Sequence, residues 1–484
     1  MQTPSMIPPS RAEQLFHLSP GLITDAEAAT ITDPYVPSSD TKRFTIRDIF
    51  RKGYPEYEKA HYVPPYVQKV MHAIMACGTG ALGYTIMKCP DCDLIQVHPD
   101  SCGNRNCPSC GHMNRLKWKA MREAELIQDI PYFHVVFTVP HQLTDLIYQN
   151  QKSMLDLLFH ASTNTVLQLC EEQYGMIPGI ISVLHTCGSN MMLHYHIHMF
   201  VSGGGLSMDK SKFIHTPGSY FLPITRIAKR YRSLYLTGLK QLYERNALSF
   251  AGHSQKLRNR YEWKDLVTQC YSVDWNVEIR KYLAAPTVPS GSAVKSSHDN
   301  IAGSFAAYAG RQFLPEVHLE EQEQPVSEEA APEAFHVLDY MSQYTNRTAM
   351  TDNRVVSSNN QTVVFEYKHY HDGGYTLKLL RLSVEEFIRR FIMNIVPKGF
   401  MKIRSAGFMA GCVRSKNLAL IRSLLGQEPP DNPVQEMNAS ELVKYFFGVD
   451  PAACPNCSKR MENYGHRIPR KVTAQHLLYM IRAS

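Results

Sequence analysis

Three histidines alternate with apolar residues in the stretch from Leu193 to Phe200. Because successive side chains of a β-strand point to opposite faces, a strand here places His194, His196 and His198 together on one face. Neutral imidazole is a common ligand of divalent metals, and two histidines two residues apart on a strand can hold one cation. The pattern favours a metal-binding strand over its alternative, a solvent-exposed polar face.

Two cysteine pairs with the spacing of zinc knuckles lie earlier in the chain, as Cys89-Pro-Asp-Cys92 and Cys107-Pro-Ser-Cys110. Each knuckle offers two thiolates from one tight turn, and four thiolates complete a tetrahedral zinc site. We therefore predict one structural Zn²⁺ bound by Cys89, Cys92, Cys107 and Cys110.

Four more cysteines are candidates for metal binding. Cys77 and Cys102 lie beside the two knuckles and could form a second site. A third knuckle, Cys454-Pro-Asn-Cys457, could bind another zinc but lacks an obvious second pair. The nearby residues that could complete it are Cys412 and His466.

Length and composition exclude several classes of protein. A chain of 484 residues predicts two to four domains, and 44% hydrophobic residues exclude wholesale disorder. The net charge of +7 is compatible with an anionic partner without identifying one. No apolar run is long enough to span a bilayer, and the first residues do not have the pattern of a secretion signal. Knuckle spacing in place of disulfide spacing predicts a reducing, cytosolic setting.

Basic residues lie on both sides of the second knuckle, with Trp118 among those that follow it. On a helix they could contact phosphates while the indole stacks on a base. A solvated helix face explains the same charges equally well. The DNA-binding candidates of this stretch are Arg105, Arg115, Lys117 and Lys119.

The histidine strand needs neighbouring elements to position it. Residues 133–139 and 181–186 are rich in β-branched and aromatic residues and are predicted to be strands. With a turn at 188–190, the second of these pairs antiparallel with the histidine strand and brings His185 near His194. Helices are predicted from about residue 143 to 174 and, with a basic amphipathic pattern, from about 223 to 248.

The second half of the chain begins with a shift in composition. Residues 285–334 are rich in Pro, Ser, Gly and Ala and then in Glu, which predicts a flexible acidic insertion. Tyr340 and Tyr344 follow, one helical turn apart and so on one helix face, although such pairs more often serve packing. A hairpin over about 363–379 and a helix that begins with a capping box of Ser383 and Glu386 come next.

Paired histidines, a divalent metal and a tyrosine helix together indicate phosphoryl transfer to a phenolic oxygen. Mg²⁺ or Mn²⁺ would act as a Lewis acid on the scissile phosphate, and a tyrosine would attack as a covalent nucleophile. A phosphotyrosine keeps the energy of the broken ester, so strands can be rejoined without ATP. A second tyrosine one turn away could accept a second strand end.

Colinear motifs over about residues 44–460 resemble the HUH transposases of rolling-circle insertion sequences, the IS91 type with two tyrosines. Their shared order is far more specific than any single motif. The motifs are Cys77–Gly83, Ser101–Cys110, Pro131–His141, His194–Gly205, Tyr340–Arg347, Glu386–Phe391 with Pro397–Phe400, and Cys454–Cys457.

The resemblance implies an α+β fold, in which an HUH nuclease core of antiparallel sheet with flanking helices carries small zinc-ribbon-like modules. It implies that His196 and His198 bind the catalytic metal and that Tyr340 and Tyr344 are the nucleophiles. The third metal ligand stays open among His185, His194 and Gln343.

The implied partner is DNA, chiefly the single-stranded or hairpin ends of a mobile element, bound by a cytoplasmic, nucleoid-associated bacterial protein. Monomer and homodimer both stay open. Further DNA-binding candidates are Arg389, Arg390, Lys398 and Lys402.

The motifs divide the chain into six predicted segments. These are an irregular arm (1–43), a zinc-binding DNA-recognition domain (44–128), the first part of the nuclease core (129–284), the acidic insertion (285–334), the second part of the core (335–425), and a C-terminal knuckle and tail (426–484).

Three features depart from the resemblance. Cys187 stands where a bulky aromatic residue is usual, Asn346 replaces a usual histidine, and the insertion is unusually long and acidic. The alternative function is therefore a catalytically decayed, zinc-dependent DNA-binding protein. A metal-dependent hydrolase is a third option, but it needs a carboxylate base near the histidines, and the sequence offers no clear candidate.

Overall fold

A computed structural model describes residues 30–31, 44–217, 221–283, 338, 341–342, 349–371, 374–430 and 432–467 of the chain. The predicted insertion at 285–334 lies outside the described residues, as does the N-terminal arm apart from strand β1 (Thr30–Ile31).

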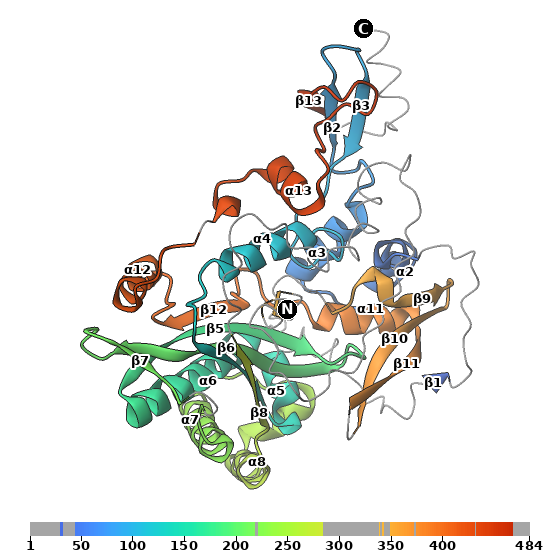
Figure 1. Cartoon of the computed structure of the whole chain (residues 1–484). Coiled ribbons are helices and arrows are strands. Elements are labelled where there is room, and N and C mark those ends of the chain that lie inside the picture. The colour runs from blue at the N-terminus through green and yellow to red at the C-terminus, as the bar shows by residue number, and fades with distance from the viewer. Residues whose placement is uncertain are drawn as a thin grey trace, which may run out of the picture.

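A central antiparallel sheet carries the histidine strand. Its strand order is β12-β5-β6-β4-β8, and a short strand, β7, pairs with β6. The histidines lie on β6, which is flanked on both sides by long strands (Figure 1). The strands are β4 (Pro131–Thr138), β5 (Met176–Cys187), β6 (Leu193–Ser207), β7 (Phe213–His215), β8 (Val277–Leu283) and β12 (Ile403–Gly407).

One face of this sheet is covered by helices, which lie below it in Figure 1. Alternation along β6 points Tyr195, Ile197 and Met199 into this layer, where they are buried in the largest apolar cluster of the described chain. The helices are α5 (Thr144–Gln149), α6 (Gln151–Tyr174), α7 (Ile224–Glu244) and α8 (Arg260–Ser272), with 3-10 turns at His141–Leu143 and Gly252–Arg258.

The opposite face of the sheet carries the histidines and a second apolar cluster. Phe200 of β6 and Val183 of β5 lie in this cluster, together with Leu418 of α12 (Arg414–Leu425). Leu338 and Met341 are also buried there, each with no exposed surface. These two residues, which follow the predicted insertion, therefore pack on the histidine face.

A separate four-stranded sheet has the order β1-β11-β10-β9 and packs with three helices around its own core. Ser383 is the N-cap of α11, as predicted, because its hydroxyl accepts a hydrogen bond from the Glu386 amide at 3.1 Å. The elements are β9 (Val355–Ser358), after a 3-10 turn at Asp352–Arg354, β10 (Thr362–His371), β11 (Gly374–Ser383), α2 (Ile46–Ala60), α3 (Pro65–Ala76) and α11 (Val384–Met393).

A small three-stranded sheet, β13-β2-β3, joins the two ends of the described chain. It projects from the body at the top of Figure 1, and α4 lies between it and the central sheet. Its elements and their neighbours are β2 (Tyr84–Lys88), β3 (Ile95–Pro99), α4 (His112–Glu123), α13 (Ala439–Phe447), which follows a 3-10 turn at Pro433–Gln435, and β13 (Glu462–Arg467).

The predicted α+β class, an antiparallel sheet with flanking helices plus small cysteine-rich modules, is confirmed. No helix within the described ranges is both long and apolar enough to cross a bilayer.

Candidate functional site

Three imidazoles converge on one face of the central sheet. His196 and His198 project from β6, and His185 of β5 stands directly opposite His196. The nitrogen atoms that these three residues offer lie within 4.8 Å of one another, and Nδ1 of His185 is 3.0 Å from Nε2 of His196. The set can therefore face a single divalent cation.

The predicted register of this hairpin is wrong by two residues, because His185 was expected near His194. The loop between the strands is longer than the predicted turn, because it is closed by a hydrogen bond from the Gly188 amide to the Met192 carbonyl. In addition, a bulge lies between His185 and Cys187. A shift of two keeps each side chain on its face, so His185 still joins the histidine cluster.

The structure separates the three candidates for the third ligand. His185 belongs to the cluster, whereas His194 is exposed and meets His196 through its carbonyl oxygen, 3.0 Å from Nδ1 of His196. Gln343 lies outside the described residues, as do Tyr340 and Tyr344.

A fourth histidine, which the sequence reasoning missed, supports the cluster. Nε2 of His134 on β4 lies 2.9 Å from Nδ1 of His198, and the two rings stack with centroids 5.1 Å apart. His134 lies between Phe133 and Val135, whose side chains enter the helical layer. Because side chains alternate along a strand, this position could have predicted that His134 lies on the histidine face.

Burial favours the neutral form of His134, His196 and His198 by lowering the pKa of each. Desolvation lowers the pKa of His196 to about 3 and that of His134 to about 4. It also lowers the pKa of His198 well below its usual value. A neutral imidazole offers the lone pair that a cation binds, so the cluster is ready for a metal at neutral pH.

The eight knuckle and flanking cysteines form two clusters, and the predicted pairing of knuckles needs correction. Cys107 and Cys110 do not meet Cys89 and Cys92. Their partners are the residues proposed for a separate site, Cys77 and Cys102. The reason is local: Cys77 ends α3, and its Sγ lies 3.4 Å from Sγ of Cys110.

The second cluster brings Cys89 and Cys92 to the C-terminal knuckle, Cys454 and Cys457. Cys412 is exposed and does not belong to it, and the His466 side chain lies outside the described part. Each cluster contains a thiol whose pKa is lowered by hydrogen bonding. Hydrogen bonding, chiefly with Cys102, lowers the pKa of Cys77 to about 7, and the Leu94 amide lowers that of Cys92 to about 6. Thiolates are the form that zinc binds.

Two of the predicted DNA contacts, Arg389 and Arg390, form ion pairs within α11. Arg390 is 1% exposed and forms an ion pair of 2.7 Å with Glu386, which also binds Arg389 at 2.6 Å. Arg390 further donates to the Asn190 carbonyl at 3.0 Å, in the loop between the histidine strands. Arg390 therefore holds α11 against that loop and is buried, so the prediction of DNA contact for it is corrected. DNA contact by Arg389, which is partly buried, stays a prediction.

The other basic candidates have diverse positions. Arg105 donates to the carbonyls of Phe400 and Pro397, at 2.6 and 3.2 Å. On α4, Arg115 contacts His112, Lys117 donates to the Met437 carbonyl and Lys119 pairs with Glu123. Lys398 is exposed, whereas burial lowers the pKa of the partly buried Lys402 to about 8.

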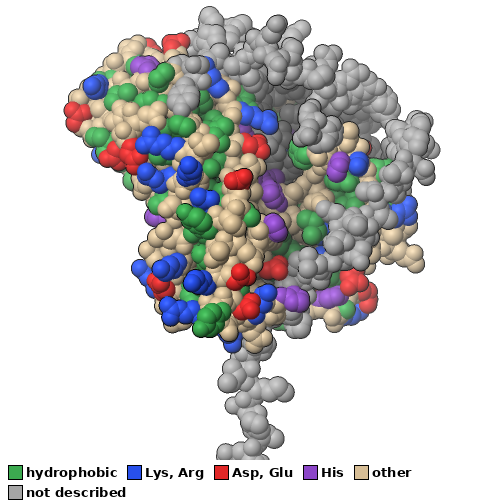
Figure 2. Space-filling view, turned by 90° about the horizontal axis from the view of Figure 1, so that it is seen from below, with side chains coloured by type: hydrophobic (Ala, Val, Ile, Leu, Met, Phe, Trp, Pro, Cys, Tyr) green, Lys and Arg blue, Asp and Glu red, His purple; other side chains and the backbone are tan. Residues whose placement is uncertain are grey.

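The basic helix α7 does not form a purely cationic surface. Arg226 and Arg230 both pair with Glu172, each at 2.9 Å. On the face seen from below, Lys and Arg side chains are mixed with Asp and Glu (Figure 2). Charge on this face therefore does not outline a nucleic-acid groove by itself.

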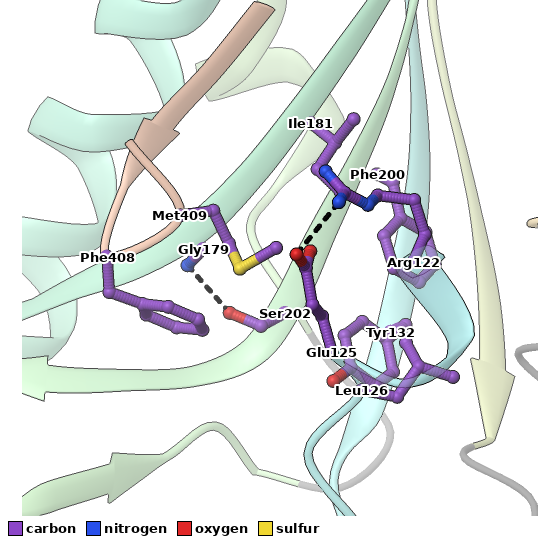
Figure 3. Close-up of a pocket in the computed structure, with 10 residues that line it drawn as sticks. All are labelled: Arg122, Glu125, Leu126, Tyr132, Gly179, Ile181, Phe200, Ser202, Phe408 and Met409. Atoms are coloured by element: carbon purple, nitrogen blue, oxygen red, sulfur yellow. Dashed lines mark hydrogen bonds and ion pairs between the residues drawn. The ribbon is translucent and has the colours of Figure 1, made fainter. Parts of the chain in front are cut away.

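A small pocket on the histidine side of the sheet belongs to packing. It is lined by Phe200 and Ser202, and the Arg122–Glu125 ion pair of 2.8 Å points into it (Figure 3). Ser202 stands four residues beyond His198 on β6, or roughly 13 Å at about 3.3 Å per residue. The pocket is separate from the imidazoles, and Arg414, 3.4 Å from Glu125, ties α12 to the end of α4 there.

Comparison with known proteins decides the family. The chain is 31% identical to "Putative transposase y4qJ" of Sinorhizobium fredii over 417 residues, covering 85% of this chain and 92% of that protein. This chain belongs to the IS91 family of transposases. It is also 25% identical to the "Transposase for insertion sequence element IS801" of Pseudomonas savastanoi pv. phaseolicola, over 80% of this chain and 81% of that protein.

Two family models match parts of this transposase. The "Transposase zinc-binding domain" matches residues 49–139, which include the first six cysteines and His134. The "Putative transposase" model matches 179–288 and 311–417, which include the three clustered histidines and the two tyrosines. The C-terminal knuckle lies outside both, and no solved structure matches the chain.

Proposed function

We propose that this transposase cuts and rejoins single-stranded DNA through a covalent 5′-phosphotyrosine, as in rolling-circle transposition. The observation that carries the proposal is the convergence of His185, His196 and His198 on one sheet face. Leu338 and Met341, which flank Tyr340 in the sequence, are buried in the apolar cluster on that same face. This packing supports a position for the tyrosine segment beside the histidines.

The chain's own groups have defined roles in this reaction. His185, His196 and His198 would hold Mg²⁺ or Mn²⁺, which supplies Lewis-acid polarisation of the scissile phosphate when bound. The phenolic oxygen of Tyr340 or Tyr344 loses its proton and forms a bond to phosphorus, while the bond to the 3′ oxygen breaks and that oxygen leaves as a hydroxyl. Attack by another 3′ hydroxyl reverses these steps and joins the strands.

Covalent capture of DNA tests the proposal. Single-stranded DNA of the element's ends, incubated with Mn²⁺, should give a covalent adduct on a denaturing gel. The His196→Ala/His198→Ala double variant should give none, whereas His194→Ala, an exposed histidine of the same strand, should keep it. An adduct that persists in the double variant at saturating metal would contradict the proposed site.

The two tyrosines are tested by removal of their hydroxyls. Each of Tyr340→Phe and Tyr344→Phe should block complete transposition, and at least one should still form an adduct. The double variant should form none, and a DNA-linked peptide without either tyrosine would overturn the assignment. If the wild type and all the tyrosine variants bind DNA but none forms an adduct, the result would instead favour the alternative, a decayed zinc-dependent DNA-binding protein.

A further inference from the structure

The C-terminal knuckle faces the first knuckle across a four-sulfur cluster. Sγ of Cys89 lies 3.4 Å from Sγ of Cys457, and Sγ of Cys92 lies 3.5 Å from Sγ of Cys454. A disulfide requires about 2.05 Å, and these cysteines are unbridged. Four sulfurs about 2.3 Å from a tetrahedral zinc lie about 3.8 Å apart, so the observed spacing suits zinc.

The two knuckles also share one hydrogen-bond pattern. The Cys89 amide donates to the Leu94 carbonyl at 2.9 Å, and the Cys454 amide donates to the Lys459 carbonyl, five residues on in the same way, at 2.7 Å. Two turns that lie far apart in the sequence therefore fold alike and present their sulfurs to one another.

The match extends to an unfavourable backbone angle. Asp93, four residues after Cys89, has φ +55°, and Ser458, four residues after Cys454, has φ +59°. Their amides donate back to the carbonyls of Cys89 and Cys454, at 3.1 and 2.8 Å. Left-handed backbone is uncommon outside glycine, so its repetition indicates that both turns are shaped for the same ligand.

Among the described residues, few other contacts hold the C-terminal knuckle and β13 in place. Strand β13 pairs only with β2 in the sheet, and the small apolar clusters here bury just Tyr84, Ile86 and Met461 besides cysteines. The ion pair of Lys459 with Asp91, at 4.0 Å between exposed side chains, contributes little. A metal would supply the folding free energy that so small a core lacks.

We propose that Cys89, Cys92, Cys454 and Cys457 bind a second structural zinc ion, which fastens the C-terminal knuckle and β13 to the N-terminal zinc-binding domain. The first zinc belongs to Cys77, Cys102, Cys107 and Cys110. The zinc-binding unit of this transposase then extends beyond residues 49–139 and requires both ends of the described chain.

Metal analysis tests the site independently of DNA cleavage. The purified full-length chain should contain close to two zinc ions, one for each cluster, and Cys454→Ser/Cys457→Ser should contain one. Cys412→Ser, an exposed cysteine outside both clusters, should keep two. A wild-type content of one zinc, or an unchanged content in the double variant, would overturn the proposal.

Thiol labelling of the wild-type protein covers the case in which the variant does not fold. With zinc bound, N-ethylmaleimide should modify Cys412 quickly and the four cysteines of the second cluster slowly, as read by peptide mass spectrometry. Chelation should expose Cys89, Cys92, Cys454 and Cys457 together. If Cys454 and Cys457 react as fast as Cys412 before chelation, the proposal is wrong.

Discussion

His134 illustrates how one buried side chain can act through another. Its Nε2 lies 2.9 Å from Nδ1 of His198, so Nε2 is the His198 nitrogen that points a lone pair at a cation once Nδ1 donates its proton to His134. Partners of this kind fix the tautomer and ring orientation of a metal ligand. His134 is a positioning residue on this account.

We expect His134→Ala to weaken the affinity for Mn²⁺ by about 10- to 100-fold, so that adduct formation needs more Mn²⁺. His134→Gln should retain most activity, because its amide oxygen can accept the same hydrogen bond. Titration with Mn²⁺ should rescue the Ala variant at high concentration. Equal losses in both variants, without rescue by metal, would show that His134 only fills space.

Arg390 carries a buried charge and Lys398 an exposed one, so their replacement should have different effects. Arg390→Ala should destabilise the fold by about 3 kcal/mol, because Glu386 loses a partner in a nearly buried ion pair. Lys398→Ala should leave the melting temperature unchanged and weaken DNA binding, because the exposed ammonium group is lost. The slope of the logarithm of the binding constant against the logarithm of the salt concentration should become smaller by about 1. Thermal melts and binding at two salt concentrations measure both. A normal melt for Arg390→Ala would contradict its internal role.

The sequence showed which residues could bind metal more readily than it showed which of them lie together. Alternation identified the face of His196 and His198, and knuckle spacing identified the cysteine pairs. The partners were not predictable, because one cluster joins Cys92 to Cys454, 362 residues apart. Likewise, the sequence shows Glu386 one turn before Arg390, but only the structure shows that Arg390 is buried and bound to the Asn190 carbonyl.

At the level of elements, the glycines in the second half of the histidine strand β6 let β5 and β6 approach. A Cβ at Gly205 would lie 2.3 Å from the carbonyl oxygen of Ile177 on β5. Gly205→Ala should therefore destabilise the sheet by about 1–3 kcal/mol, measured by urea unfolding. Gly411→Ala, where a Cβ meets nothing within 4 Å, is the control. Equal unfolding midpoints for the two variants would contradict this reading.

Local patterns predicted several elements well. Strand β4 begins two residues before the predicted 133–139 stretch, and the helix predicted from about 143 to 174 is present as α5 and α6. The hairpin register was missed, because the loop after Cys187 and the bulge before it depend on contacts with α11, such as the hydrogen bond from Asn394 to the Met191 carbonyl at 3.1 Å.

Across the whole molecule, the central sheet and the region around the first cysteine cluster have separate apolar cores. The large cluster under the central sheet contains no knuckle cysteine, whereas the cluster around α2, α3 and α11 includes Cys77 and Cys107. Sequence motifs could place the zinc-binding and histidine regions along the chain, but not the return of β13 to β2. That contact joins residues near the two ends and has no local signature.

This division predicts how loss of the first zinc spreads. Cys107→Ser should release that zinc and unfold the region around residues 77–115, because thiolate ligands supply its folding free energy through the metal. Amide exchange should rise there and in α2 and α3, which share a core with Cys107. It should stay low in α6 and α7, whose core is the separate cluster under the sheet.

Cys412→Ser, which removes an exposed thiol, is the control. Elemental analysis of zinc and hydrogen exchange read by mass spectrometry measure both effects, and equal zinc in wild type and variant, or uniform exchange along the chain, would contradict the prediction.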